Sequence, residues 1–308
     1  MENQMQTVPT VPNRMVDVVL DTDTYNEIDD QYALAFLLLS PERANTVGIT
    51  AAPFFNQHSS SPADGMEKSY QEILKVLKLM KREDMIPKTY RGSTCYLPDA
   101  KTPVQSEAAT YLVEEAKRHS PENPLYIVAI GAITNVASAI LLDPEVMEKN
   151  TVLVWLGGHR LDWHDTKEFN LRQDIPAAQI VFDSAIPLVQ LPCFGVVSEF
   201  RTTEGELRAW LEGKNPIADY LCKNTIREAE SYAKGTAWSR CIWDVTAVAW
   251  LLNDNNRYLT TRVIPAPRPE LNGVYSFPES GRKKMVYVYF VKRDNLFTDL
   301  FRKLTAIR

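Results

Sequence analysis

A stretch near the N-terminus concentrates carboxylates as no other part of the chain does. Residues 21–30 read DTDTYNEIDD, so five acidic side chains fall within ten residues. They follow the apolar, β-branched segment Val16–Leu20, which predicts a buried strand. Like charges this close repel one another, and burying them unpaired is costly, so a cation is the natural compensation. An all-oxygen donor set favours Ca²⁺ or Mg²⁺ over zinc. The alternative is a solvated acidic loop in which Asp29 or Asp30 caps the next helix.

Three later turns carry further groups that could contact a ligand. Residues 130–135, IGAITN, follow an expected strand, and their glycine lets backbone approach a ligand. Glu168-Phe169-Asn170 precedes an expected helix, after a loop that begins at Gly157-Gly158. Trp243-Asp244 opens an apolar helix. Taken singly, each is explained equally well as a helix start, a cap or a core position.

The elements that must position these turns alternate between strand and helix. Apolar runs predict strands at 16–20, 47–50, 87–90, 126–129 and 152–156. Helical spacing predicts helices at 31–40, 65–82, 106–119 and 134–142. This alternation predicts an open, mainly parallel, Rossmann-like α/β sheet flanked by helices. Such sheets bind ligands beyond the carboxyl ends of their strands, which is where the polar turns fall.

The second half of the sequence is more helical and shows no long linker. Helices are expected at 203–232, 245–252 and 295–304, with a strand at 284–291. The basic run Arg282-Lys283-Lys284 is expected to be a solvated strand edge. We therefore predict one domain over residues 16–308, preceded by a flexible N-terminal segment, residues 1–15.

Composition excludes several classes of function. With 308 residues and a net charge of −5, the chain lacks the basic excess of a nucleic-acid binder. No stretch is apolar enough to be a confident membrane span, and the start does not resemble a signal peptide. The four cysteines form no CxxC pair, so we expect reduced thiols and a cytoplasmic protein. These features favour an enzyme or binder of small molecules.

The motifs gain meaning from their order along the chain. Asp21 and Asp23, the Gly-x-x-Thr-Asn turn, Gly157-Gly158 followed by Glu168-Phe169-Asn170, and a late Asp244 occur in the sequence typical of one family. The chain resembles the inosine–uridine nucleoside hydrolases from about Val16 to the last expected helix. The resemblance implies the nucleoside hydrolase fold and hydrolysis of the N-glycosidic bond of ribonucleosides. It also implies a small-molecule nucleoside or ribosyl substrate and a homodimer or homotetramer.

The resemblance also implies roles for individual residues. Asp23 would be both metal ligand and general base. The other ligands of the Ca²⁺ ion would be Asp30, Asp244 and the backbone carbonyl of Ile130. Ribose contacts would come from Asp29, Glu168, Asn170 and, as a looser match, Asn56.

The sequence departs from the family pattern in two places. Two extra residues lie between Asp23 and Asp29, so Asn26-Glu27 must loop out or add a ligand. Trp243 stands where many members have a histidine that protonates the leaving base. A purine-preferring branch has Trp there, so a purine preference, and with it a role in purine salvage, is expected. The acid for the leaving base is then unassigned; His58, His159 and His164 lie in loops that could flank the pocket, although a surface role is the simpler reading for each.

Two rival functions remain open at this stage. Residues 18–24, VVLDTDT, also fit the motif of haloacid-dehalogenase-like phosphatases, in which Asp21 would be the nucleophile and Asp23 the acid. The second rival is a non-catalytic ribose or nucleoside binding protein that kept the metal site.

Overall fold

The computed structural model describes residues 8–307 and is built on one central sheet. Its eight strands run in the order β3-β2-β1-β4-β5-β6-β12-β9. In that order they are Thr89–Tyr90, Ala44–Ala51, Val16–Thr22, Leu125–Ala129, Thr151–Leu156, Leu188–Leu191, Lys284–Val291 and Leu259–Pro265. Every neighbouring pair is parallel except β12 and β9. The expectation of a mainly parallel sheet is confirmed.

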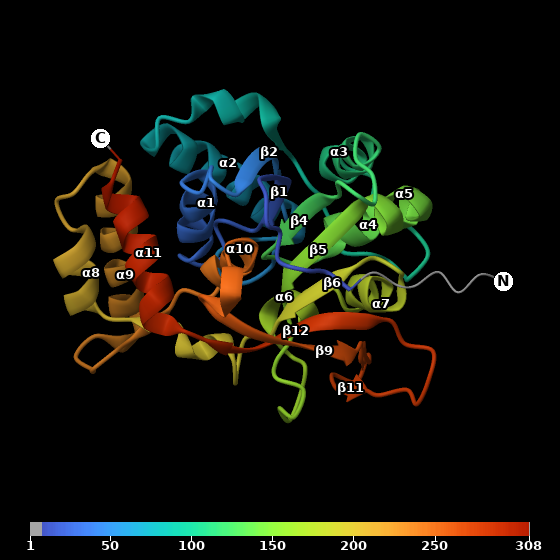
Figure 1. Ribbon diagram of the computed structural model, residues 1–308. Helices are drawn as coiled ribbons and strands as arrows, with labels where there is room; N and C mark the ends of the chain where they lie inside the picture. Colours follow the sequence, from blue (N-terminus) through green and yellow to red (C-terminus); the bar gives the residue numbers. More distant parts are fainter. Residues whose placement is uncertain (1–7, 308) are drawn as a thin grey trace.

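Helices cover both faces of this sheet and create two apolar cores (Figure 1). One face packs against α1 (Asp30–Leu38) and α10 (Val245–Leu251). The other packs against α3 (Glu107–Ala116), α4 (Thr134–Leu142) and α7 (Ile175–Asp183). Because strands in such a sheet are buried on both sides, they read as continuous apolar runs rather than alternating ones. β4 and β5 are buried along their whole length.

The remaining elements extend the two helical layers and the sheet edge. The helices are α2 (Pro62–Leu79), α5 (Pro144–Asn150), α6 (Phe169–Gln173), α8 (Glu204–Leu211), α9 (Pro216–Ala233) and α11 (Arg293–Thr305). Short strands form two further pairs: β7 (Arg201–Thr202) with β8 (Arg240–Cys241), and β10 (Arg268–Pro269) with β11 (Tyr275–Ser276). Three 3₁₀ turns complete the set: Glu83–Lys88, Val197–Glu199 and Asp254–Asn256.

The helix expected at 203–232 is wrong as one element, because the chain turns between α8 and α9. Gly213 has φ 72°, a left-handed conformation that favours glycine. Asn215 then caps α9 by accepting a hydrogen bond from the Ala218 N–H, and Pro216 occupies the first helical position. Strands β6 and β9 were not predicted from the sequence.

The first residues of the described chain lie against the body of the protein. Val8 and Val11 pack against the larger apolar core, and Pro9 and Pro12 are buried. The first part of the segment expected to be flexible, residues 1–7, lies outside the described residues, and the flexibility of the rest stays a prediction. Within residues 8–307, no helix is long and apolar enough to cross a membrane.

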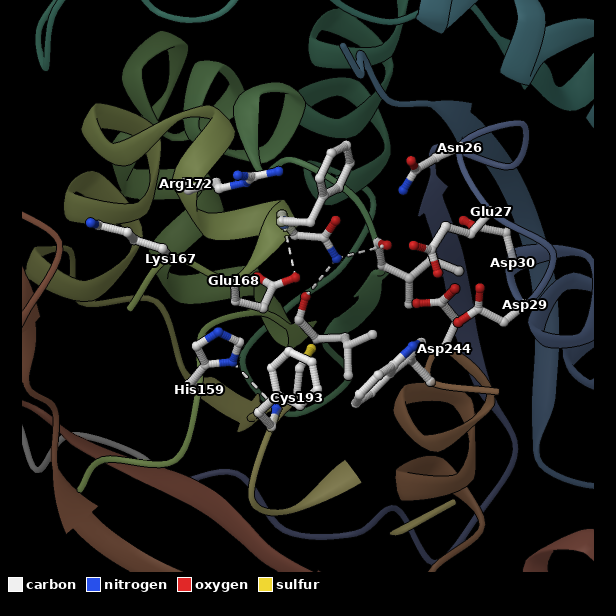
Figure 2. Close-up of a pocket in the computed structure, with 16 residues that line it drawn as sticks. Asn26, Glu27, Asp29, Asp30, His159, Lys167, Glu168, Arg172, Cys193 and Asp244 are labelled. Atoms are coloured by element: carbon white, nitrogen blue, oxygen red, sulfur yellow. Dashed lines mark hydrogen bonds between the residues drawn. The ribbon is translucent and has the colours of Figure 1, made fainter. Parts of the chain in front are cut away.

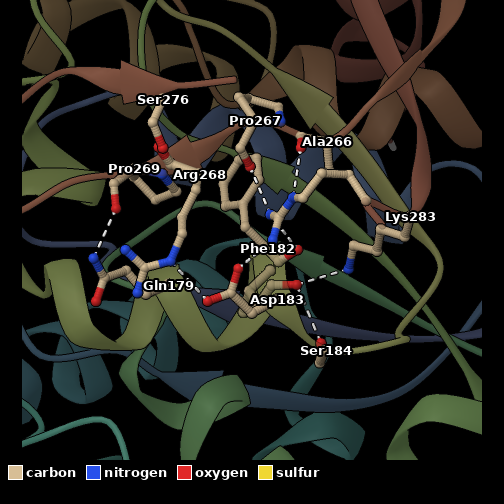
Figure 3. A network of polar contacts seen from close by, with 12 residues as sticks. Gln179, Phe182, Asp183, Ser184, Ala266, Pro267, Arg268, Pro269, Ser276 and Lys283 are labelled. Atoms are coloured by element: carbon tan, nitrogen blue, oxygen red, sulfur yellow. Dashed lines mark hydrogen bonds and ion pairs between the residues drawn. The ribbon is translucent and has the colours of Figure 1, made fainter. Parts of the chain in front are cut away.

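A network of charged side chains joins α7 to the sheet edge, far along the chain from the acidic turn (Figure 3). Arg282 donates to the carboxylate of Asp183 at 2.5 Å. It also donates to three backbone carbonyls, those of Phe182, Ala266 and Pro267. Arg268 donates to the other oxygen of Asp183 at 3.0 Å. Each charge in this network therefore has an opposite charge or a carbonyl beside it.

Lys283 is buried within the same network, so the expectation of a solvated edge is wrong for this residue. Its Nζ donates to the backbone carbonyls of Val181 and Ile186, at 2.7 and 2.8 Å. Burial lowers the pKa of Lys283 to about 7. The neighbouring Lys284 is exposed, as a solvated edge predicts.

Candidate active site

A pocket of about 360 Å³ opens at the carboxyl ends of the parallel strands (Figure 2). It lies beside β1 and β4, the point at which the strand order reverses and where such sheets bind ligands. Seven predicted site residues line it: Asp29, Asp30, Ile130, Glu168, Asn170, Trp243 and Asp244. Residues far apart in the sequence thus meet at one edge of the sheet.

One wall of the pocket is acidic. Asp29, Asp30 and Asp244 each offer a carboxylate oxygen within 4.8 Å of the others, and all three are buried. Asp29 and Asp30 begin α1, while Asp244 immediately precedes α10, so two packed helices fix their spacing. Burial raises the pKa of Asp29 to about 6, and the charge of Glu27 adds to the rise. Burial and then repulsion by Asp29 raise the pKa values of both other carboxyls.

Asp23 lies behind this wall, directly after β1. It is fully buried, and neither of its carboxylate oxygens has a hydrogen-bond partner among the described residues. Burial, followed by the charge of Asp30, raises its pKa well above the usual range. A Cβ at Gly131 would lie only 3.0 Å from Oδ1 of Asp23, so glycine preserves the space beside this carboxylate.

Several buried carboxylate oxygens near this wall accept no hydrogen bond, which shows whether the site suits a cation. Oδ2 of Asp21, both oxygens of Asp23 and Oδ1 of Asp29 are buried without a partner in residues 8–307. Buried polar groups are nearly always hydrogen-bonded, so the three bare oxygens of Asp23 and Asp29, which lie at and behind the wall, need a compensating ligand. The donors are all hard oxygen atoms, which suit a divalent cation such as Ca²⁺ or Mg²⁺. The residues present therefore fit the metal that the sequence predicts.

The opposite wall is built by the Glu-Phe-Asn segment. Glu168 caps α6: its Oε1 accepts from the Asn170 N–H, and its Oε2 accepts from the N–H groups of Gly158 and Leu171. Nδ2 of Asn170 donates to the carbonyls of Ile130 and Leu156, each at 3.1 Å. These bonds fix both side chains and leave Oδ1 of Asn170 without a partner among the described residues.

Aromatic rings form a third side. Trp243 meets Phe194 edge to face, with ring centroids 5.4 Å apart, and Phe194 stacks on Trp163 at 5.8 Å. The N–H of Phe194 donates to Nδ1 of His159 at 3.3 Å, which places the imidazole proton on Nε2. Burial lowers the pKa of His159 to about 4, so the ring is uncharged at neutral pH. His159 therefore enters the pocket as a neutral hydrogen-bond donor.

Asn56 is the one predicted ribose contact that the structure does not bring to the pocket. Its Nδ2 donates to Oδ1 of Asn26 at 2.6 Å, and Asn26, one of the two extra residues, lines the pocket instead. Glu27 lines it as well and pairs with Arg240 at 2.5 Å. Of the other two histidines, His58 borders a neighbouring hollow and His164 faces solvent beside Asp165.

Five further pocket residues were not predicted: Leu156, Lys167, Arg172, Cys193 and Phe194. The two cations flank the Glu-Phe-Asn segment, so their proximity to a predicted contact was a signal in the sequence. Cys193 and Phe194 follow β6, and missing that strand concealed them.

Asp21 is placed for a structural role. Its Oδ1 accepts from Thr50 Oγ1 at 2.6 Å and from Asn135 Nδ2 at 2.8 Å, and it does not line the pocket. A phosphatase nucleophile has to reach its substrate, so this placement gives the phosphatase alternative no support.

Comparison with known proteins shows which family the sequence and the fold resemble. Residues 18–273 match the family model described as inosine-uridine preferring nucleoside hydrolase. The pyrimidine-specific ribonucleoside hydrolase RihA of Salmonella paratyphi B is 28% identical over 259 residues, covering 76% of this chain and 79% of the relative. A solved plant nucleoside hydrolase, PpNRh1, has a TM-score of 0.74 at 20% identity, covering 96% of this chain and 100% of its own. A purine-preferring ribonucleoside hydrolase from Gardnerella vaginalis has the same TM-score at 19% identity, covering 94% and 98%. These likenesses confirm the predicted fold.

Proposed function

The chain belongs to the inosine-uridine preferring nucleoside hydrolase family and is an N-glycosyl hydrolase, and we propose that Asp23 is its general base. The observation that carries this assignment is the carboxylate of Asp23, buried beside the pocket with both oxygens unpartnered among the described residues. Burial and the charge of Asp30 raise the pKa of this carboxyl when no cation is bound.

In the proposed reaction, water replaces the base at C1′ of the ribose. The N-glycosidic bond breaks, and its electron pair leaves with the base. The oxygen of the attacking water bonds to C1′, one water proton passes to Asp23, and the leaving base takes up a proton. The sugar passes through an oxocarbenium-like state, and the carboxylates around it favour that positive charge.

We propose Ca²⁺ as the cation, held by Asp23, Asp30, Asp244 and the carbonyl of Ile130. When bound, such a cation lowers the pKa of water and orients it. The two bare oxygens of Asp23, and the close approach of the Asp30 and Asp244 carboxylates, support this proposal.

Ribose would be positioned between the two walls. Asp29 would accept from the ribose hydroxyls, and Glu168 and Asn170 would contact the sugar from the opposite side. Asn56 would act through Asn26, because its amide fixes the orientation of the Asn26 side chain. Holding the sugar in this way supplies orientation, which is a large part of catalysis.

The leaving base would stack on Trp243, which suggests a preference for purines. The edge-to-face contact with Phe194 gives this wall a fixed apolar surface. Named relatives include both a pyrimidine-specific and a purine-preferring enzyme, so the preference has to be measured.

We also propose a cellular compartment and an oligomeric state for the enzyme. All four cysteines are free, and three of them are buried, which supports a reducing, cytoplasmic compartment. The family resemblance supports a homodimer or homotetramer, and purine stacking would suit purine salvage.

Base release from a nucleoside panel tests the function. Purified protein is incubated with inosine, adenosine, guanosine, uridine and cytidine, with Ca²⁺ and then with chelator. The proposal predicts metal-dependent release of base that is lost in Asp23→Asn. If nothing is released while ribose still binds, the chain is a non-catalytic nucleoside binder.

A further inference from the structure

We propose that the substrate is a ribosyl compound carrying a phosphate, most simply a nucleoside 5′-monophosphate, bound by Lys167 and Arg172. This inference rests on the proposed function and names the substrate class of the same site. Lys167 and Arg172 are the cations that line the pocket. Figure 2 shows them beside Glu168, on the side away from Asp29, Asp30 and Asp244.

Neither cation has an internal partner. No ion pair or side-chain hydrogen bond joins Lys167 or Arg172 to another residue of the described chain, 8–307. Glu168 is the carboxylate expected to pair with them, since it is adjacent to Lys167 and four residues before Arg172. Both of its oxygens instead accept backbone N–H groups. Residues 167–172 therefore present two positive charges at the pocket, while the carboxylate of Glu168 is occupied by backbone N–H groups.

Arg172 is also held at the pocket. Its guanidinium lies 5.4 Å from the ring centroid of Phe169, another lining residue. This cation–π contact draws the otherwise exposed guanidinium of Arg172 toward the ring, and its planar donors suit recognition of phosphate. Lys167 is exposed beside it and supplies a second, mobile charge.

The positions of the two walls indicate which part of the substrate meets the cations. The proposed contact of Asp29 with the ribose hydroxyls places that edge of the sugar at the acidic wall. The sugar's opposite end then faces Glu168 and its cationic neighbours. A phosphate on the 5′ carbon would lie there, away from Asp29, Asp30 and Asp244 and between the two cations that flank Glu168. Hydrolysis would release free base and ribose 5-phosphate, with the phosphate ester intact.

The test compares matched substrates. We would measure kcat/KM for inosine against inosine 5′-monophosphate, and for uridine against uridine 5′-monophosphate, with Ca²⁺ present. The proposal predicts at least a tenfold preference for each monophosphate. The double variant Lys167→Gln/Arg172→Gln should lower the monophosphate-to-nucleoside ratio at least tenfold. The control Lys214→Gln, an exposed lysine outside the pocket, should leave the ratio unchanged.

The outcomes separate this inference from the proposed function. Release of base from nucleosides, with no preference for monophosphates, would overturn the inference and leave the hydrolase intact. If neither substrate is cleaved, thermal stabilisation by ribose 5-phosphate against ribose still decides the matter. The inference then predicts a larger shift with ribose 5-phosphate that the double variant abolishes. Equal shifts with the two sugars would overturn it.

Discussion

Two clusters of charged side chains in this protein differ in how they are satisfied. In the network of Asp183, Arg268 and Arg282, opposite charges meet and the spare donors of Arg282 reach backbone carbonyls. In the acidic wall of the pocket, Asp29, Asp30 and Asp244 lie against one another, and the hydroxyl of Thr22 donates to Asp30. Arg240 is the cation whose charge lowers the pKa of Asp29, and it is already paired with Glu27. One cluster is complete within the chain, and the other keeps an excess of negative charge.

This difference in pairing distinguishes charged groups that stabilise the fold from charged groups that serve the active site. A buried charge costs free energy unless it is paired, so a fold keeps an unpaired cluster only where something outside the chain completes it. The network between α7 and the sheet edge should therefore matter for stability alone. The acidic wall should oppose folding when empty and support chemistry when a cation is bound.

The largest effect is expected at Asp23. Asp23→Asn keeps the shape but removes the base, so kcat for base release should fall by about 10²–10⁴-fold. Asp162→Asn, an exposed loop aspartate paired with Arg160, is the matched control and should keep its activity. Retention of most activity by Asp23→Asn, in protein of unchanged melting temperature, would remove Asp23 from the reaction.

A substitution in the network of Asp183, Arg268 and Arg282 should lower stability and leave catalysis unchanged. Arg282→Met removes one of the two donors to Asp183 and the guanidinium that donates to three backbone carbonyls, so the free energy of unfolding should fall by about 3 kcal/mol. Urea titration measures this loss, with Arg302→Met, an exposed arginine, as control. Base release per folded molecule at low temperature should be unchanged. A loss of kcat without loss of stability would contradict the distinction between the clusters.

Lys283 makes the structural cluster sensitive to pH. Its pKa is about 7 when folded and lies near 10.5 when unfolded, so the unfolded state binds more protons between these values. Stability should therefore rise with pH across this window. Between pH 7 and 9 the wild-type should gain about 2 kcal/mol relative to Lys283→Met. The exposed Lys284 provides the control, because Lys284→Met should show no such difference.

The smallest effect concerns the choice of base. Trp243→Ala removes the proposed stacking surface, worth about 1 kcal/mol. kcat/KM for inosine should then fall several-fold more than kcat/KM for uridine. Equal losses for the two substrates would show that the indole supports the pocket without selecting purines.

The sequence was informative where chemistry and chain order coincide. The acidic turn and Asp244 were found because a charged group follows an apolar strand or opens an apolar helix. The Glu-Phe-Asn segment was found through its place in the ordered motifs of the family. The sheet followed from alternation, since buried parallel strands are apolar throughout.

The sequence was less informative where the conformation of a loop decides which way a side chain points. Asn56 was matched by its place after a strand, but its amide turns to Asn26, and the two extra residues enter the pocket instead. Arg172 looks like an ordinary helix-surface charge until the structure shows that Glu168 caps the helix and leaves it unpaired. β9 was missed because its residues are half exposed at the sheet edge and carry no continuous apolar run.

The stability of Asp244→Asn, measured by urea titration at pH 7 in chelator and in Ca²⁺, tests the central claim most directly. Burial and repulsion raise the folded pKa of Asp244, so its ionised form opposes folding at neutral pH when no cation is present. In chelator the variant should therefore be more stable than wild-type, by about 1 kcal/mol or more. In Ca²⁺ the order should reverse, because the ion binds the folded wild-type and stabilises it. Asp183→Asn, the comparison from the complete cluster, should be destabilised in both. If Asp244→Asn is less stable than wild-type in chelator too, the acidic wall is satisfied within the chain and the account is wrong.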